Sequence, residues 1–230
     1  MSLATIIIKK LKKLTKVFKK PTFHFTAEIA EQRLISDIKW MSAKELLEKH
    51  PALVRQLYDG VTDESRHPGS QLKPHWNKMA LQLGSYYLSE LNKPDMAAIF
   101  YQASLPSKAM IDMSADNMIV QFPKIVADLL KLPKDVILLQ EWGIICSKLI
   151  THYLDRQEYA NALICYERVI RQPNFLDIIK PEQLFSLGNY FLHAMNDRRR
   201  ALEFFTVLRN FPSYREDAEK MLHVASTEKD

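Results

Sequence analysis

Apolar residues near the start of the chain recur at the spacing of one helix face. These apolar positions are Leu3, Ile7, Leu11, Leu14 and Phe18. Steps of three and four residues place side chains on one stripe of an α-helix, and the residues between them fall on the opposite arc. Pro21 follows, and proline ends a helix because it has no backbone N–H to donate. The pattern therefore predicts an amphipathic helix over residues 3–20.

Shorter helical patterns occupy residues 21–70 and end in a polar loop. Ser42 followed by Glu45 is the signature of a capping box, in which each residue bonds the backbone N–H of the other at the start of a helix. Residues 59–70 contain two of the five glycines of the chain and a proline, which is typical of a connecting loop. We therefore expect an N-terminal helical region over residues 21–70 and a separate helical domain over residues 71–230.

Beyond that loop, a helical apolar pattern runs nearly unbroken to Val224. Its short interruptions each contain Pro, Asn or Asp. Segments of about 15 residues joined by tight turns are typical of antiparallel helix pairs. The composition agrees, because 5 glycines among 230 residues are too few for the turns and phosphate loops of β-rich or α/β folds. The sequence predicts an all-α protein.

Three windows in this region share one pattern of small and aromatic residues. The windows are Gly84-x-x-Tyr87 with Ala97 and Tyr101, Ile150-x-x-Tyr153 with Ala162 and Tyr166, and Gly188-x-x-Phe191 with Ala201 and Phe205. A small residue in the first helix lets the second helix approach, and an aromatic ring fills the space beside the alanine. The window starts are 66 and 38 residues apart, close to two units and one unit of about 34 residues.

This pattern resembles the tetratricopeptide repeat (TPR) family, whose unit of about 34 residues is a helix–turn–helix with small and aromatic residues at these offsets. The resemblance covers residues 76–212 and implies a solenoid of helical hairpins preceded by N-terminal helices. The first and third windows carry one extra residue in the turn between their two helices, and Ile150 stands where the family prefers Gly or Ala. Residues 107–140 match poorly, so we expect a degenerate helical pair there. An irregular helical bundle is the alternative fold.

In the family, the first helices of the stack line a concave groove that holds an extended peptide or a helix. Carried over by this resemblance, the predicted groove positions are Lys78, Leu81, Ser85, Leu88, Ser89, Ile144, Ser147, Thr151, Leu154, Asp155, Glu182, Phe185, Asn189, Leu192 and His193. Only Lys78 and Asn189 match the Lys, Arg and Asn residues with which some members clamp a C-terminal carboxylate. The remaining positions suit an apolar peptide or a packed helix, so the expected function is a non-catalytic scaffold that binds a protein or peptide partner.

Residues typical of catalysis or metal binding are sparse. None of the seven histidines forms a His-Glu-x-x-His motif or pairs with a cysteine at the spacing of zinc ligands. The closely spaced glycines of phosphate loops, dinucleotide motifs and nucleophile elbows are missing. We therefore expect no catalytic residue, no metal and no cofactor.

Cysteine and tryptophan residues fall within apolar stretches. Cys146 and Cys165 each follow a pair of aliphatic residues, where cysteine acts as a small hydrophobe. Two such thiols cannot build a disulfide framework and indicate a reducing, cytoplasmic environment. Trp40, Trp76 and Trp142 share the helical periodicity of their neighbours, so we expect them in the core or between helices.

The positive charge of the chain is concentrated at its N-terminus. The lysines of this segment are Lys9, Lys10, Lys12, Lys13, Lys16, Lys19 and Lys20, with no acidic residue among them. Removing these seven from the 32 Lys and Arg of the chain leaves 25 against 27 Asp and Glu, so the other 210 residues carry a formal charge of −2. No stretch has the length of a membrane span or the features of a signal peptide. The charge therefore indicates a local electrostatic function rather than a basic surface over the whole fold.

Residues 3–20 combine a lysine-rich face with an apolar face that includes Leu11, Leu14 and Phe18. Such a helix suits an anionic membrane surface, where each basic residue contributes about 1 kcal/mol. Three other uses remain open: packing on the chain's own helices, contact with a partner protein, and nucleic-acid binding, which the missing arginines and interleaved aromatics make the weakest. The segment could also be the juxtamembrane end of a longer protein. The expected location is cytoplasmic, peripheral at a membrane.

Overall fold

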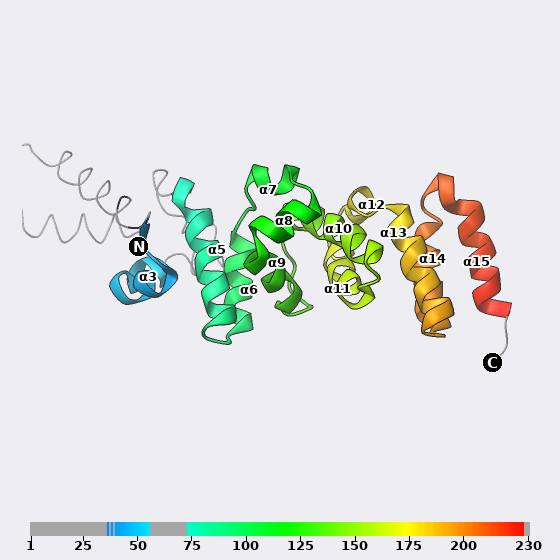
Figure 1. Cartoon of the computed structure of the whole chain (residues 1–230), viewed down its shortest axis with the longest axis horizontal. Coiled ribbons are helices and arrows are strands. Elements are labelled where there is room, and N and C mark those ends of the chain that lie inside the picture. The colour runs from blue at the N-terminus through cyan, green and yellow to red at the C-terminus, as the bar shows by residue number, and fades with distance from the viewer. Residues whose placement is uncertain (1–35, 37, 39, 56–72, 228–230) are drawn as a thin grey trace, which may run out of the picture. The chain divides into compact units, whose positions relative to one another are not determined.

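The structure is a computed structural model that describes residues 36, 38, 40–55 and 73–227, and all regular structure among them is helical (Figure 1). This confirms the predicted all-α class. The predicted helix over residues 3–20 and the predicted boundaries at residues 20 and 70 lie outside the described residues. The helices are α3 (Ala43–Lys49), α5 (Lys73–Ser89), α6 (Pro94–Ala103), α7 (Lys108–Asp112), α8 (Ala115–Gln121), α9 (Pro123–Lys131), α10 (Gln140–Asp155), α11 (Tyr159–Val169), α12 (Phe175–Ile178), α13 (Pro181–Asn189), α14 (Arg198–Leu208) and α15 (Arg215–Thr227).

The contacts of the chain define two compact units. The first comprises residues 1–105 with 131–133, and the second comprises residues 106–130 with 134–230. In the first unit, α3 packs on α5 and contributes Leu46 to a core that also holds Leu83 and Phe100, all fully buried. The division at residue 105 falls within the segment that the sequence predicts as one repeat domain.

The capping box predicted before α3 is present. The Ser42 Oγ accepts the backbone N–H of Glu45 at 3.3 Å, and the Glu45 Oε2 accepts the backbone N–H of Ser42 at 2.9 Å. These two bonds satisfy N–H groups that a helix start otherwise leaves unpaired. The bonds to Ser42, together with Lys49 one turn later, lower the pKa of the Glu45 carboxyl.

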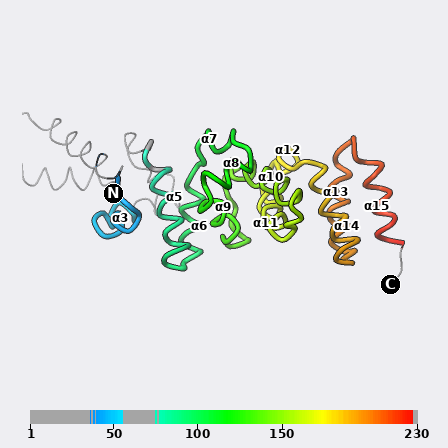
Figure 2. Tube along the Cα trace, viewed as in Figure 1, coloured from blue at the N-terminus to red at the C-terminus, as the bar shows by residue number. Residues whose placement is uncertain are grey.

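The three predicted windows lie on three helical hairpins, formed by α5 with α6, α10 with α11, and α13 with α14 (Figure 2). A π-helical turn over Tyr190–Ala194 continues α13 toward α14. Ala97, Ala162 and Ala201 are completely buried in the second helices, as the pattern predicts. The repeated alanine therefore marks a contact between the helices of each hairpin.

The small residues of the first and third windows lie directly under aromatic rings. A β-carbon added to Gly84 would stand 2.9 Å from Cδ2 of Tyr101, and one added to Gly188 would stand 2.5 Å from Cε1 of Phe205. Carbon atoms in contact normally lie 3.5–4.0 Å apart, so only glycine fits under these rings without a shift. In the middle hairpin Ile150 is fully buried, and the ring of Tyr166 instead contacts Phe204 of α14, with ring centroids 4.7 Å apart.

Each hairpin turn contains one residue in the left-handed backbone region. Asn92, Gln157 and Asn196 have φ angles of 49°, 61° and 50°, and they are the non-glycine residues with positive φ in the described part of the chain. The residue that follows each of them donates its backbone N–H to the carbonyl of an aromatic residue in the first helix, at 2.8 Å in all three hairpins. These bonds run from Lys93 to Tyr87, from Glu158 to Tyr153 and from Asp197 to Phe191. A left-handed residue that lets the chain bond back onto the helix end is a standard helix stop.

The extra residue of the first and third turns is absorbed by a wider last helical turn. Leu91 donates to the carbonyl of Tyr86 at 3.2 Å and Met195 to that of Tyr190 at 3.1 Å, both across five residues. The middle hairpin instead closes with a bond from Gln157 to Leu154, across three residues. A π-type turn accommodates one more residue than an α-helical turn. The difference in turn length therefore leaves the aromatic residue in the same place in each hairpin.

The segment expected to form a degenerate helical pair forms three short helices, α7, α8 and α9. Serine side chains cap two of them: Ser107 accepts from the N–H of Met110 and Ser114 from that of Asn117. Because each cap begins a new helix, the expectation of two helices is wrong in number. Lys148 of α10 donates to the Met113 carbonyl at 2.9 Å and so places a cation at the C-terminal end of α7.

The tryptophan and cysteine predictions have mixed outcomes. Trp142 is completely buried, and so are Cys146 and Cys165, as expected. Trp40 is 79% exposed, so its predicted place in the core is wrong. The side chain of Trp76 lies outside the described residues.

Candidate functional site

The predicted groove positions differ widely in exposure. Four are buried, namely Ser85, Leu88, Ser147 and Leu192. Six are half-buried, namely Leu81, Ile144, Thr151, Leu154, Phe185 and Asn189. The exposed ones are Lys78, Ser89, Asp155, Glu182 and His193. The accessible part of this surface is therefore smaller than the sequence pattern suggests.

Two of the predicted groove positions on α10 bond to the next hairpin. Gln183, in the first turn of α13, donates its Nε2 to the Ser147 carbonyl at 2.6 Å and to the Thr151 Oγ1 at 2.7 Å. Its Oε1 accepts the backbone N–H of Lys180 at 3.0 Å. The Ser147 hydroxyl donates to the Ile178 carbonyl at 2.8 Å. Since Gln183 is only 2% exposed, this network holds α10 against α13 and leaves these two side chains bonded within the chain.

The predicted positions at the start of α13 contact the segment that leads into α15. The ring of Phe185 lies 6.2 Å from the ring of Tyr214, centroid to centroid. The Tyr214 hydroxyl donates to the Glu182 Oε1 at 3.3 Å. Tyr214 therefore partly covers this end of α13, and the open positions of the third hairpin lie further along the helix, toward Asn189 and His193.

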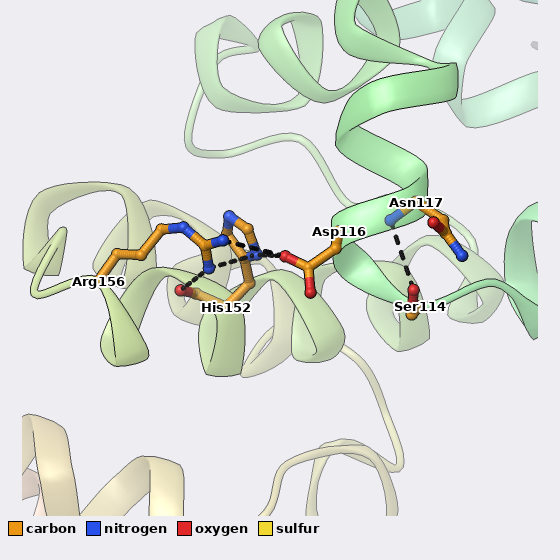
Figure 3. A network of polar contacts seen from close by, with 5 residues as sticks. All are labelled: Ser114, Asp116, Asn117, His152 and Arg156. Carbon is orange, nitrogen blue, oxygen red and sulfur yellow. Dashed lines mark hydrogen bonds and ion pairs between the residues drawn. The ribbon is translucent and has the colours of Figure 1, made fainter.

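A cluster of polar side chains joins α8 to the C-terminal end of α10 (Figure 3). The Asp116 Oδ1 lies 2.8 Å from the His152 Nδ1 and 3.2 Å from the Arg156 Nη2. Arg156 also places its Nη1 3.0 Å from the same ring nitrogen of His152. Asp116 stands in the first turn of α8, where a carboxylate is favoured by the helix dipole, and Arg156 follows the C-terminal end of α10, where a cation is favoured.

The Asp116–His152 pair is the arrangement from which a general base could be built, so its surroundings decide its role. A His–carboxylate dyad acts on a substrate only when the second ring nitrogen reaches the reacting group. The His152 side chain is 9% exposed, and its ring packs edge-on against Tyr153 with centroids 5.4 Å apart. The geometry fits a polar clamp between two helices better than a catalytic site.

Sequence reasoning missed this cluster. Asp116 is 36 residues from His152, and no motif relates the two. The available signal was local: His152 and Arg156 are four residues apart at a helix end, which places their side chains on one face. Their partner could be identified only once the fold had placed α8 beside α10.

Other kinds of site are not found in the described part of the chain. No group of three or more His, Cys, Asp and Glu side chains there is arranged to hold a metal ion. Among the same residues, no helix has the length and apolar character needed to cross a membrane. Comparison with protein-family models, curated proteins and solved structures gave no match.

Proposed function

We propose that this protein is a non-catalytic scaffold that binds a protein partner through TPR-like helical hairpins. One observation carries the proposal: the first and third hairpins repeat the same contacts. Tyr87 stacks on Phe100 with centroids 5.4 Å apart and an interplanar angle of 11°, and Phe191 stacks on Phe204 at 5.5 Å and 12°. The glycine-under-ring contact is repeated in the same two hairpins. Equivalent contacts at equivalent positions are expected of repeats and are not required in an irregular bundle.

The proposed partner surface of the second unit is formed by the groove positions that remain accessible. Leu154 and Asn189 are half-buried, and His193 is exposed. This combination of one apolar and two polar side chains suits a partner segment with an apolar anchor. The Asp116–His152 pair has no catalytic role in this function, because its short contact connects α8 to α10.

The experiment is affinity capture from an extract of the source cells with the full chain as bait. A Leu154→Ser, His193→Ala double variant removes an apolar and a polar contact from the proposed surface. The matched control carries Ala160→Ser and Thr206→Ala, two exposed positions on the second helices α11 and α14. We expect a protein that the wild-type chain and the control retain and the double variant loses, and direct titration with that purified protein should give the same order. Equal retention by all three chains would exclude this surface as the binding site.

We further propose that residues 3–20 attach this scaffold to an anionic membrane surface. The support is the sequence: seven lysines oppose an apolar stripe, while the rest of the chain has a formal charge of −2. Lysines attract anionic headgroups and the apolar stripe inserts at the interface. The full chain should therefore sediment with vesicles that contain phosphatidylserine and should bind pure phosphatidylcholine vesicles poorly.

Two changes separate membrane attachment from its alternatives. Added salt should weaken sedimentation, because exposed charges are screened within about 8–10 Å at physiological ionic strength. Replacing Leu11, Leu14 and Phe18 with Ser should abolish it, because charge alone provides no apolar insertion. If residues 3–20 pack on the protein itself, their amides will be protected from hydrogen exchange without lipid and the lipid composition will have no effect.

A further inference from the structure

Exposed apolar side chains gather on two connections of the second unit. Residues 134–139 lead into α10, and residues 170–180 lead from α11 to α13 and contain α12. Nine large apolar residues are exposed in the described part of the chain, and four of them lie on these connections: Ile137, Leu139, Ile170 and Leu176. Single exposed apolar residues are common on protein surfaces, whereas a group of them marks an interaction site. We call these four residues the connection patch.

Two polar contacts hold the two connections side by side. The Lys134 Nζ lies 3.1 Å from the Glu167 Oε2, near the end of α11, and the Gln172 Nε2 donates to the Leu138 carbonyl at 3.0 Å. Ile137 and Leu139 are the neighbours of Leu138, and Ile170 lies between Glu167 and Gln172 in the chain. The apolar residues of the two connections therefore belong to one surface at the N-terminal end of α10.

Burial alternates along residues 136–139. Val136 and Leu138 are buried, whereas Ile137 is 57% exposed and Leu139 is also exposed. Side chains of an extended chain point alternately to its two sides, and the side that faces water is normally polar. Here the outward side is apolar as well, so these two side chains serve no contact within the unit that would explain them.

The charged residues beside the connection patch are of both signs. Arg171 and Lys180 are exposed bases, Asp135 and Asp177 are exposed acids, and none of the four forms an ion pair with another described residue. Two bases and two acids do not suit an anionic membrane or a nucleic acid, which attract an excess of bases. They make the surface complementary to itself, and a two-fold interface requires this because the same patch lies on both subunits.

We propose that the connection patch joins two copies of this chain in a two-fold symmetric dimer. The apolar residues of the two copies cover each other at the centre of the interface, and the bases beside one patch face the acids beside the other. The interface lies at the N-terminal end of α10, whereas Leu154 of the proposed partner surface lies in the last turn of that helix. The dimer therefore leaves that partner surface open and presents it twice in one particle.

The first test is sedimentation equilibrium of the full chain from about 1 µM to about 1 mM, which spans weak to moderate affinities. The apparent mass should rise from 26.8 kDa toward twice that value and stop there. Ile137→Asp should stay monomeric, because two carboxylates would be buried in an apolar contact, and Ile170→Asp should give the same result independently. The matched control is Val120→Asp, since Val120 is 78% exposed on α8 of the same unit, and it should dimerise as the wild type does. Circular dichroism confirms that each variant is folded.

The charged residues give a second test that leaves the apolar residues unchanged. Arg171→Glu with Lys180→Glu leaves only acids among the four, and Asp135→Lys with Asp177→Lys leaves only bases. Each double variant alone should remain monomeric, because like charges would face each other across the two-fold axis. An equimolar mixture of the two should associate, since acids then face bases.

Several outcomes would overturn the proposal. A wild-type chain that stays monomeric over the whole range, a mass that grows beyond the dimer, or a dimer that Ile137→Asp leaves intact would each do so. Loss of the dimer in Val120→Asp, or a mixture of the charge variants that does not associate, would overturn it as well. The chain with Leu11, Leu14 and Phe18 replaced by Ser should still dimerise, and its failure to do so would assign the association to residues 3–20 instead.

Discussion

The ring of Phe205 lies over Gly188 so closely that a β-carbon at residue 188 would stand 2.5 Å from its Cε1. In Gly188→Ala the added carbon should cost ~1–3 kcal/mol, as is usual in a filled contact. Alanine gains about 1 kcal/mol over glycine in a helix interior, so the free energy of unfolding should fall by up to about 2 kcal/mol. The midpoint of urea unfolding, followed by circular dichroism, measures the difference.

Gly84→Ala provides the graded comparison. The added carbon would stand 2.9 Å from Cδ2 of Tyr101, so less movement of the ring is needed than at Gly188. We expect a smaller destabilisation from Gly84→Ala than from Gly188→Ala. A Gly188→Ala chain as stable as the wild type would show that the ring does not depend on glycine for its place.

Ala162→Leu should overpack the middle hairpin. Ala162 is 0% exposed on α11, so three added carbon atoms must displace α10 or leave their preferred rotamer, at ~1–3 kcal/mol. The control is Ala160→Leu, because Ala160 is exposed on the same helix. Thermal melts of the two variants should differ clearly, and similar melting temperatures would mean that the assigned phase of this helix is wrong.

Gln183→Ala should lower the free energy of unfolding, because it removes the side-chain bonds between α10 and α13. The change leaves the Ser147 carbonyl and the Lys180 N–H without the bonds that Gln183 makes, in a site that is nearly closed to water. Buried polar groups that lose their partner cost about 1–3 kcal/mol. Gln140→Ala, at an exposed position of α10, is the control in urea unfolding. A loss of stability no greater than that of the control would remove Gln183 as the link between α10 and α13.

The buried ring of Tyr166 predicts a loss of stability in alkali. Burial raises the pKa of Tyr166 to about 12, and the nearby Glu203 carboxylate adds to the rise. Because this pKa is above the ordinary value of 10.0, the neutral phenol contributes stability that is fully present below pH 10 and is lost as the pH rises toward 12. Melting temperatures measured from pH 9 to about 12 should fall less steeply for Tyr166→Phe than for the wild type.

The Asp116 cluster should contribute little to stability despite its short distances. The Asp116 side chain is 69% exposed and that of Arg156 is 50% exposed, so solvent screens their attraction. Exposed ion pairs contribute about 0–1 kcal/mol in double-mutant cycles. A cycle of Asp116→Asn with Arg156→Gln should give a coupling energy within that range, and a clearly larger value would show that the cluster is more than a surface clamp.

The parts of the fold that were predicted from the sequence are those that local spacing determines. Ala97 and Ala201 could be placed in contacts because each lies a fixed number of residues from a small residue and an aromatic one. Ser42 and Glu45 could be assigned a capping box because both partners lie within one helical turn. Such features need no knowledge of which helices meet.

The parts that were missed depend on contacts between distant segments. Gln183 bonds Ser147 across 36 residues, so Ser147 looked like an open position of a groove while it bonds within the chain. The partners of Asp116 on α10 could be identified only from the structure, in which residues 107–140 form three helices rather than the expected pair. Trp40 shows a further limit, since an apolar periodicity shows which face a residue is on and not whether another element covers it.

The π-type turns at Leu91 and Met195 allow the connection of a hairpin to be one residue longer without a change in the packing of its two helices. Each takes up one residue where the first helix ends, so the ring that follows the glycine stays in register with the second helix. A gene that gains or loses a codon at this point would change the connection and leave the buried contacts as they were. The turn can therefore change in length by one residue, while the rings of Tyr101 and Phe205 limit residues 84 and 188 to a side chain no larger than hydrogen.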